Sequence, residues 1–165
     1  MKYVNFCLAA ILSLALSSGS VKKDLPSTGY YRGETIPDIV LTGLGGERLT
    51  LHELKGKKVV LNFWASYDGP SRAANVQLYH FLSQQNADVM FVSVSFDENR
   101  NVLQRTLAMD HLETALCFHI EEGRDAELYK DFRFSNGFSN YLIDEKGVIT
   151  ATNVTPDRLR LILEV

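Results

Sequence analysis

Cysteine is scarce in this chain of 165 residues, which has only Cys7 and Cys117. Cys7 lies in an apolar stretch at the start of the chain that we expect to be removed, so the remaining protein would hold a single thiol. One thiol excludes an internal disulfide, and a secreted domain without one must gain its stability from a buried core. With 45% hydrophobic residues and a length suited to one domain, the chain can form such a core.

The sequence also lacks any run of basic residues, and its formal net charge is −3. This balance gives no electrostatic reason to expect nucleic acid as a partner. The sequence shows no internal repeats and no low-complexity tracts. Its composition is that of an ordinary soluble globular protein.

Residues 1–20 have the pattern of a secretory signal peptide, with Lys2 ahead of an apolar run at 6–16 and small residues at 17–20. The apolar run is too short for a comfortable membrane span, so we expect cleavage near 17–20 and no span afterwards. No cysteine stands at the end of the run, which disfavours lipid attachment.

Residues 21–35 are polar, include Pro26 and Gly29, and show no clear period. They are typical of a linker or a loosely packed N-terminal arm, which Tyr30 and Tyr31 could dock.

From residue 36 to the C-terminus, hydrophobic periodicity predicts one α/β domain. The expected elements are short strands at 39–41 and 48–51 around a Gly-rich turn, a buried strand at 59–65, a helix at 71–85, a second buried strand at 89–96, helices at 98–109 and 124–132, strands at 141–143 and 148–150, and a helix opening at 155. A crossover helix between the buried strands makes them parallel, whereas the late hairpin is antiparallel. The pattern therefore predicts a mixed sheet with helices on both faces and an N-terminal β-hairpin.

The stretch Asp68-Gly69-Pro70-Ser71 suits the start of the 71–85 helix. Asp68 is a candidate N-cap, and Pro70 fits the first turn. A carboxylate cannot exchange with sulfur, and a serine without an adjacent base is a poor nucleophile. A hydrolase built on Asp68 or Ser71 would need a histidine, and none stands at a motif position. We favour capping over catalysis.

Cys117 precedes His119 by two residues, so in an extended segment both side chains point the same way. The imidazole could then support a thiolate, or the pair could bind a metal with His111 or Glu121. The alternative, which we favour, is that Cys117 is a small buried residue on an edge strand, because free cysteine is among the most often buried residue types. We expect no metal and no cofactor.

Two aromatic residues, Trp64 and Tyr67, stand just before Asp68, at the start of the loop that leads into the 71–85 helix, and could shape a binding groove. An aromatic side chain beside a central strand more often packs in the core, which we expect of Trp64. The pattern does not decide the place of Tyr67.

The segments Ile36-Pro37-Asp38-Ile39 and Leu54-Lys55-Gly56-Lys57, and the stretch 59–65, resemble the opening of the secreted thiol-disulfide oxidoreductases of the thioredoxin superfamily. The branch in question includes the periplasmic TlpA and ResA proteins. Residues 141–149 are similar to its closing hairpin. The resemblance implies a thioredoxin-like fold for 36–165 and a periplasmic location.

Two features depart from this branch. After its Trp-Ala pair the branch carries C-x-x-C, where this chain has Asp68 and Ser71. Before its last hairpin, opposite the thiols, the branch carries a cis-proline, where this chain has Phe138. A cis bond before a non-proline residue costs about 3 to 4 kcal/mol, so we expect a trans bond at Phe138 and a remodelled groove.

We therefore expect a non-redox, thioredoxin-like module of the cell envelope rather than an enzyme. It would hold a peptide or partner protein in a groove formed by Trp64, Tyr67, Gly69, Pro70 and Phe138. The competing interpretation is a thiol-disulfide oxidoreductase of the TlpA/ResA type that acts through Cys117 or a partner's thiol.

Overall fold

The computed structural model describes residues 26–85, 88–112 and 117–164. The strands are β1 (Val40–Thr42), β2 (Arg48–Thr50), β3 (Lys58–Trp64), β4 (Val89–Ser95), β5 (Cys117–His119), β6 (Asn140–Ile143) and β7 (Ile149–Thr152). The helices are α1 (Gly69–Gln84), α2 (Arg100–Met109), α3 (Glu127–Asp131) and α4 (Pro156–Leu163), with 3₁₀ turns η1 (Leu51–Leu54), η2 (Gly123–Asp125) and η3 (Phe134–Asn136). The predicted signal peptide lies outside the described residues.

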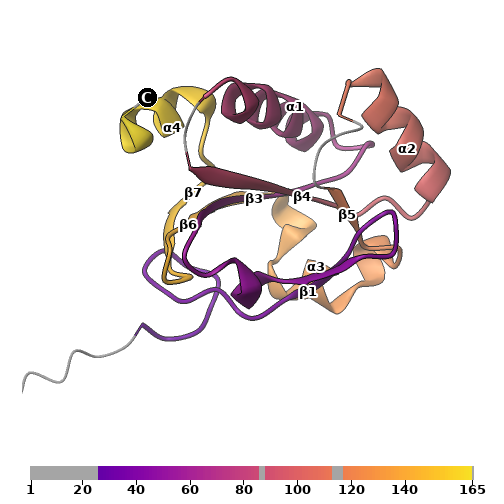
Figure 1. Cartoon of the computed structure of the whole chain (residues 1–165). Helices are drawn as coiled ribbons and strands as arrows, with labels where there is room; N and C mark the ends of the chain where they lie inside the picture. Colours follow the sequence, from indigo (N-terminus) through magenta and orange to yellow (C-terminus); the bar gives the residue numbers. More distant parts are fainter. Residues whose placement is uncertain (1–25, 86–87, 113–116, 165) are drawn as a thin grey trace, which may run out of the picture.

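A five-stranded mixed sheet forms the centre of the molecule, in the order β5-β4-β3-β6-β7. β3 pairs in parallel with β4, and β4 pairs in parallel with β5. β6 is antiparallel to both β3 and β7. In Figure 1, α1, α2 and α4 cover one face of this sheet, while α3 and the β1–β2 hairpin cover the other. The predicted thioredoxin-like fold is confirmed.

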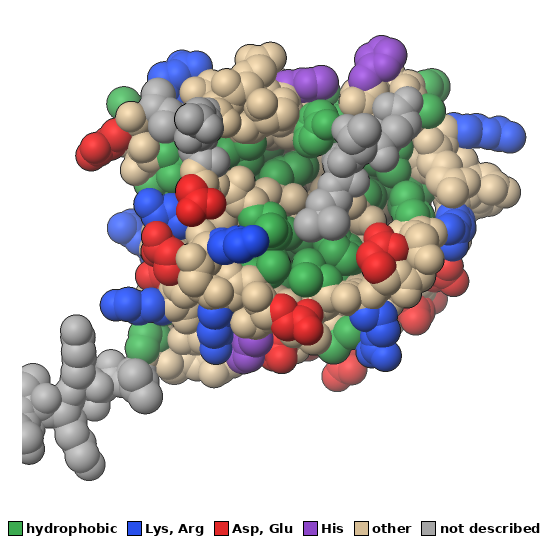
Figure 2. All heavy atoms as spheres, in the orientation of Figure 1, with side chains coloured by type: hydrophobic (Ala, Val, Ile, Leu, Met, Phe, Trp, Pro, Cys, Tyr) green, Lys and Arg blue, Asp and Glu red, His purple; other side chains and the backbone are tan. Residues whose placement is uncertain are grey.

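The central strand β3 is buried on both faces, as its nearly continuous apolar sequence requires. Alternate residues Val59, Leu61 and Phe63 join the core beneath α3 and the hairpin. Val60 and Trp64 point to the opposite face and pack beneath the helices. Figure 2 shows hydrophobic side chains between the two layers, with acidic and basic side chains around them.

The N-terminal arm is docked from residue 27 onward. Thr35 forms bridges with Thr28 and with Val148, and the ring of Tyr30 lies 4.4 Å from that of Phe132. These contacts place 27–35 against the closing hairpin of the domain, so this part of the predicted arm is not a loose linker.

Two expectations about secondary structure need correction. Periodicity did not include β5 in the predicted order of elements, because three residues are too few to show a period. The predicted helix at 124–132 is divided into η2 and α3. The break falls at buried Ala126, whose ψ of 141° is extended rather than helical.

Candidate functional site

The loop between β3 and α1 ends in a helix cap. Asp68 has extended backbone angles, and its Oδ1 accepts a hydrogen bond from the backbone N–H of Ser71 at 2.9 Å. Pro70 stands in the first helical turn. The predicted capping role of Asp68 is thereby confirmed, and such a cap contributes about 1 kcal/mol to stability.

Ser71 is engaged in the same loop and is only 7% exposed. Its hydroxyl donates to the carbonyl of Asp68 at 3.2 Å and accepts from the N–H of Ala65 at 3.4 Å. Across the described residues, no histidine bonds to Asp68 or Ser71. The pair thus holds the loop together and has no base that would activate the hydroxyl.

A groove of about 430 Å³, here called the loop groove, lies beside this cap. Its lining residues are Asn62, Phe63, Asp68, Pro70, Ser71, Ala74, 136–140 and 153–155. Asp68, Pro70 and Ser71 form one part of the lining, and the segment that contains Phe138 forms another. Tyr67 and Gly69, predicted to take part, do not line the groove.

Phe138 is anchored in the aromatic core beside the loop groove. The peptide bond before it is trans, as are the others in the described part of the chain. Its ring centroid lies 5.2 Å from that of Phe134, 5.5 Å from that of Phe96 and 5.9 Å from that of Tyr129. The side chain of Phe138 therefore holds this segment in place by packing.

Trp64 does not line the loop groove, and its expected place in the core is confirmed. Its side chain is fully buried, and its indole N–H donates to the hydroxyl of Ser93 at 2.7 Å. The reason is the alternation along β3, which points Trp64 toward the helix layer. Tyr67 is 51% exposed, and the guanidinium of Arg124 lies 4.9 Å from its ring centre.

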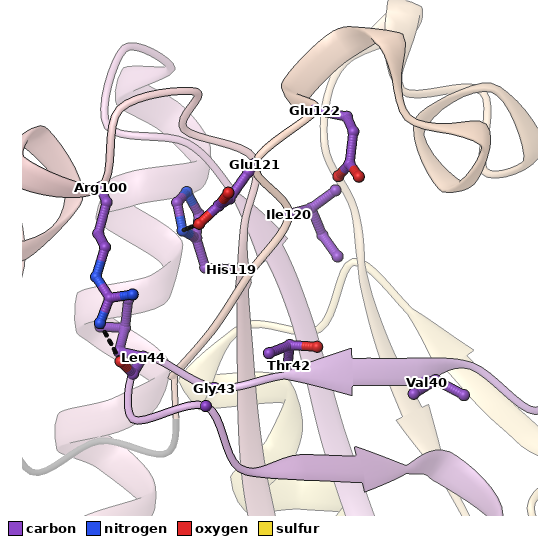
Figure 3. Close-up of a pocket in the computed structure, with 10 residues that line it drawn as sticks. Val40, Thr42, Gly43, Leu44, Arg100, His119, Ile120, Glu121 and Glu122 are labelled. Carbon is purple, nitrogen blue, oxygen red and sulfur yellow. Dashed lines mark hydrogen bonds and ion pairs between the residues drawn. The ribbon is translucent and has the colours of Figure 1, made fainter.

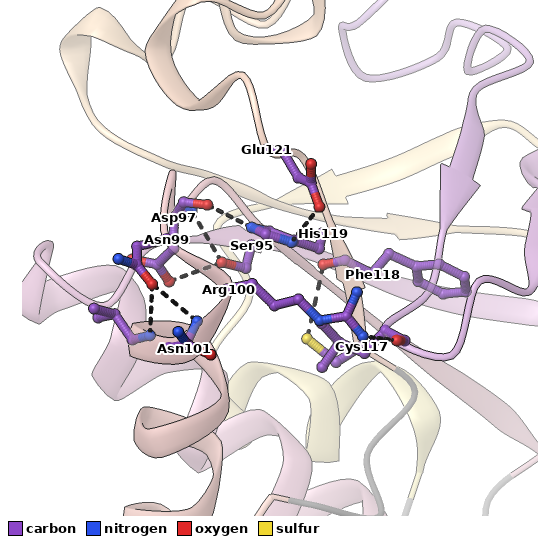
Figure 4. Close-up of polar contacts among 11 residues, drawn as sticks. Ser95, Asp97, Asn99, Arg100, Asn101, Cys117, Phe118, His119 and Glu121 are labelled. Atoms are coloured by element: carbon purple, nitrogen blue, oxygen red, sulfur yellow. Dashed lines mark hydrogen bonds and ion pairs between the residues drawn. The ribbon is translucent and has the colours of Figure 1, made fainter.

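A buried carboxylate that sequence reasoning missed holds the start of the loop. Asp97 is only 3% exposed and accepts hydrogen bonds from the N–H and hydroxyl of Ser66 and from the hydroxyl of Ser95. Its own carbonyl contacts Nε2 of His119, which places the imidazole between Asp97 and Glu121 (Figure 4). The sequence does hold one signal for Asp97, which is its position just after β4. The carboxyl ends of neighbouring parallel strands meet at one edge of the sheet, so a residue there lies close to the loop that follows β3.

A second buried polar group lies beneath the loop, between β3 and α1. Asn75 accepts hydrogen bonds through Oδ1 from the amide of Asn62 at 3.0 Å and from the hydroxyl of Ser93 at 2.9 Å. All three side chains are almost fully buried. They link α1 to two central strands and so fix the helix that begins at the loop.

The thiol of Cys117 is buried on edge strand β5, as favoured from the sequence, with 6% of the residue exposed. Burial raises its pKa from 9.0 to about 12. The hydroxyl of Ser93 lies 4.0 Å from the sulfur, while His119 contacts the carbonyl of Asp97 instead. The expected support of a thiolate by His119 is therefore absent: the imidazole contacts Asp97, and the raised pKa keeps the thiol protonated at neutral pH.

Within the described ranges, His, Cys, Asp and Glu side chains form no group of three or more that could hold a metal ion. The same part of the chain has no helix with both the length and the apolar character that a membrane crossing requires.

A separate pocket of about 460 Å³ lies between the β1–β2 turn, the end of β5 and the start of α2. Figure 3 shows Arg100 on one side of it, with His119 and Glu121 beyond and Val40 and Thr42 along β1. Arg100 donates to the carbonyl of Leu44. This pocket shares no lining residue with the loop groove.

Comparison with known proteins places this architecture in a family. A family model described as Redoxin matches residues 32–161. Thioredoxin-like protein YneN of Bacillus subtilis is 30% identical over 128 residues, covering 76% of this chain and 73% of that protein. Thiol-disulfide oxidoreductase ResA of Geobacillus kaustophilus is 28% identical over 139 residues, covering 79% of this chain and 75% of that protein.

Among solved structures, a thioredoxin-like protein from Parabacteroides distasonis superposes with a TM-score of 0.73 and 37% identity. The superposition covers 84% of this chain and 98% of that one. The chain therefore belongs to the Redoxin family and shares the thioredoxin-like fold of relatives named thiol-disulfide oxidoreductases.

Proposed function

We propose that this protein is a thioredoxin-like domain of the cell envelope that binds a peptide or partner protein in the loop groove without exchanging disulfides. One observation carries the proposal: Asp68 and Ser71, which we infer occupy the two positions of the family's cysteine pair, are hydrogen-bonded to each other in a helix cap. The envelope location rests on the signal-peptide pattern of residues 1–20.

Disulfide exchange needs a thiolate that attacks sulfur and a second thiol that resolves the mixed intermediate. Neither a carboxylate nor a hydroxyl can take part in either step. The substitutions therefore remove the reaction but leave the helix start, the groove and the packed segment at Phe138 in place.

The lining of the loop groove supports a binding role. It combines the carboxylate of Asp68 with amide and hydroxyl groups, and it contains no lysine, arginine or histidine. Such a surface offers hydrogen-bond partners to the backbone and polar side chains of an extended segment. The anchoring of Phe138 keeps this surface ordered before a partner arrives, which lowers the entropic cost of binding.

The name of the ResA relative favours the competing function, a thiol-disulfide oxidoreductase, which in this chain would act through Cys117 or a partner's thiol. The burial of Cys117 and its pKa of about 12 argue against the first route. An incoming disulfide could reach this sulfur only after local opening of the edge strand.

Reduction of insulin by dithiothreitol, followed as turbidity, tests the proposal. The protein should leave the uncatalysed rate unchanged, whereas an Asp68→Cys/Ser71→Cys variant should accelerate the reaction by restoring the missing sulfur pair. A rate enhancement by the unmodified protein that disappears in a Cys117→Ser variant would overturn the non-redox function.

A further inference from the structure

A second groove, here called the acidic groove, runs between β1 and the η2–α3 segment and has a volume of about 470 Å³. Its lining residues are Tyr30, 37–40, Ile120, Glu122, 125–128 and Asp131. None of them lines the loop groove, so the two surfaces are separate.

The charge of the acidic groove is of one sign. Its five carboxylates are Asp38, Glu122, Asp125, Glu127 and Asp131, and no lysine, arginine or histidine lines it. All five residues are exposed. The chain as a whole has a net charge of only −3, so negative charge is concentrated on this surface.

Little of that charge is neutralised within the protein. Asp38 faces His52 at 3.5 Å, and Asp131 accepts a hydrogen bond from the hydroxyl of Tyr30 at 3.3 Å. For Glu122, Asp125 and Glu127, no ion pair occurs among the described residues. Arg124, which lies in η2 next to Asp125, is directed to Tyr67 instead. A ligand for this surface should therefore be cationic.

The floor of the acidic groove is apolar. Ile39, Val40, Ile120 and Leu128 line it between the carboxylates. Val40 is 47% exposed, whereas the next residue of β1, Leu41, points to the opposite side and is fully buried. A ligand that pairs only with the charges would leave this apolar surface in water.

The backbone of β1 presents an open edge to the same groove. Gly43 donates to the carbonyl of Glu47, and Leu51 donates to that of Ile39, so these residues of the hairpin form its hydrogen-bonded pairs. Hydrogen-bonded and non-hydrogen-bonded pairs alternate along an antiparallel pair, so Val40 and Thr42 are the residues of β1 that direct their N–H and C=O groups away from β2.

On that side of β1, the bridge that occurs within the described residues joins Gly43 to Phe118. β5 ends at His119, and Figure 3 shows Ile120 and Glu122 on the far side of the opening from Val40 and Thr42. An unpaired strand edge is a template for a further strand.

We propose that the acidic groove binds an extended cationic peptide segment, with alternating basic and apolar residues, as an added strand along β1 at Val40. Main-chain hydrogen bonds to Val40 would fix its register, its apolar side chains would cover the floor, and its lysine or arginine side chains would face Glu122, Asp125 and Glu127. This binding is independent of the loop groove.

The test uses the purified protein and a fluorescein-labelled peptide of alternating lysine and valine, followed by fluorescence anisotropy at low salt. A Glu122→Gln/Asp125→Asn/Glu127→Gln variant should bind about tenfold more weakly, because three exposed ion pairs are lost together. A control variant, Glu145→Gln/Asp157→Asn/Glu164→Gln, changes the net charge equally at exposed positions outside the groove. It should change binding by less than about twofold.

Amide hydrogen exchange of Val40 gives a second readout, which charge attraction alone would not move. Peptide binding should slow exchange of the Val40 N–H, and spermine, a cation without a backbone, should not. The proposal is wrong if the peptide fails to bind the unmodified protein, if the two variants weaken binding equally, or if the Val40 amide is unaffected by the bound peptide.

Discussion

Oδ1 of Asp68 accepts a hydrogen bond from the backbone N–H of Ser71 at 2.9 Å, so these two residues stabilise the start of α1 together. The proposed non-redox function depends on this relationship, because it gives Asp68 a structural role that needs no chemistry. Replacement of Asp68 should therefore change stability without creating or removing a reaction.

The Asp68→Ala variant should lower the free energy of unfolding by about 1 kcal/mol through loss of the cap. Asp68→Asn keeps an acceptor for the Ser71 N–H and should retain most of that stability. Urea denaturation of the three proteins checks this order. Equal stability of the alanine variant and the unmodified protein would contradict the cap.

A bidentate ion pair between Arg72 and Asp110 ties the first turn of α1 to the end of α2. Arg72 Nε and a terminal nitrogen donate to the two carboxylate oxygens at 2.7 and 2.6 Å, and the Asp110 side chain is 13% exposed. Loss of either partner should cost about 1.5 to 3 kcal/mol, the range for hydrogen bonds to charged groups.

A double-mutant cycle with Arg72→Met and Asp110→Asn, measured by urea denaturation, isolates the coupling between the two side chains. Strictly additive effects of the single replacements would show that the pair does not stabilise the helix start.

The burial of the Cys117 thiol predicts that the free energy of unfolding depends on pH in the alkaline range. Its pKa is raised by burial from 9.0 to about 12, so above pH 9.0 the unfolded chain loses a proton that the native protein keeps. The stabilising difference is fully present below pH 9.0 and is lost as the pH rises toward about 12. Within this window, this group lowers the free energy of unfolding by about 1.4 kcal/mol for each pH unit.

A Cys117→Ala variant should lack this part of the slope when unfolding free energies are compared across the same window. Burial also raises the pKa of Tyr141 to about 12, but Tyr141 is present in both proteins, and its contribution cancels in the difference. Parallel curves for the two proteins would mean that the thiol ionises in the native state and is accessible.

Much of the fold followed from local pattern. The nearly continuous apolar run of β3 and the spaced apolar residues of α1 fixed a strand–loop–helix unit, and the Asp-x-x-Ser spacing fixed its cap. β5 was missing from the predicted order of elements because its three residues show no period, although an edge strand was expected at Cys117. Its place at the end of the strand order, and not its composition, makes it an edge strand.

The candidate site was only partly predictable for the same reason. Phe138 could be located by counting back from the closing hairpin, but its packing against Phe96 depends on tertiary structure. Asp97 and Ser66 are 31 residues apart in sequence, so no local motif links them. The acidic groove likewise joins carboxylates from separate segments, which sequence spacing does not reveal.

Affinity capture from the organism's own envelope extract, with free thiols blocked beforehand, tests the central claim most directly. Ala74 lines the loop groove and Ala73 does not, so Ala74→Arg should block a partner that Ala73→Arg still retains. We predict a partner that elutes without reductant, persists in a Cys117→Ser variant and is lost in Ala74→Arg. A partner that is released only by dithiothreitol and is lost in Cys117→Ser would contradict binding without disulfide exchange.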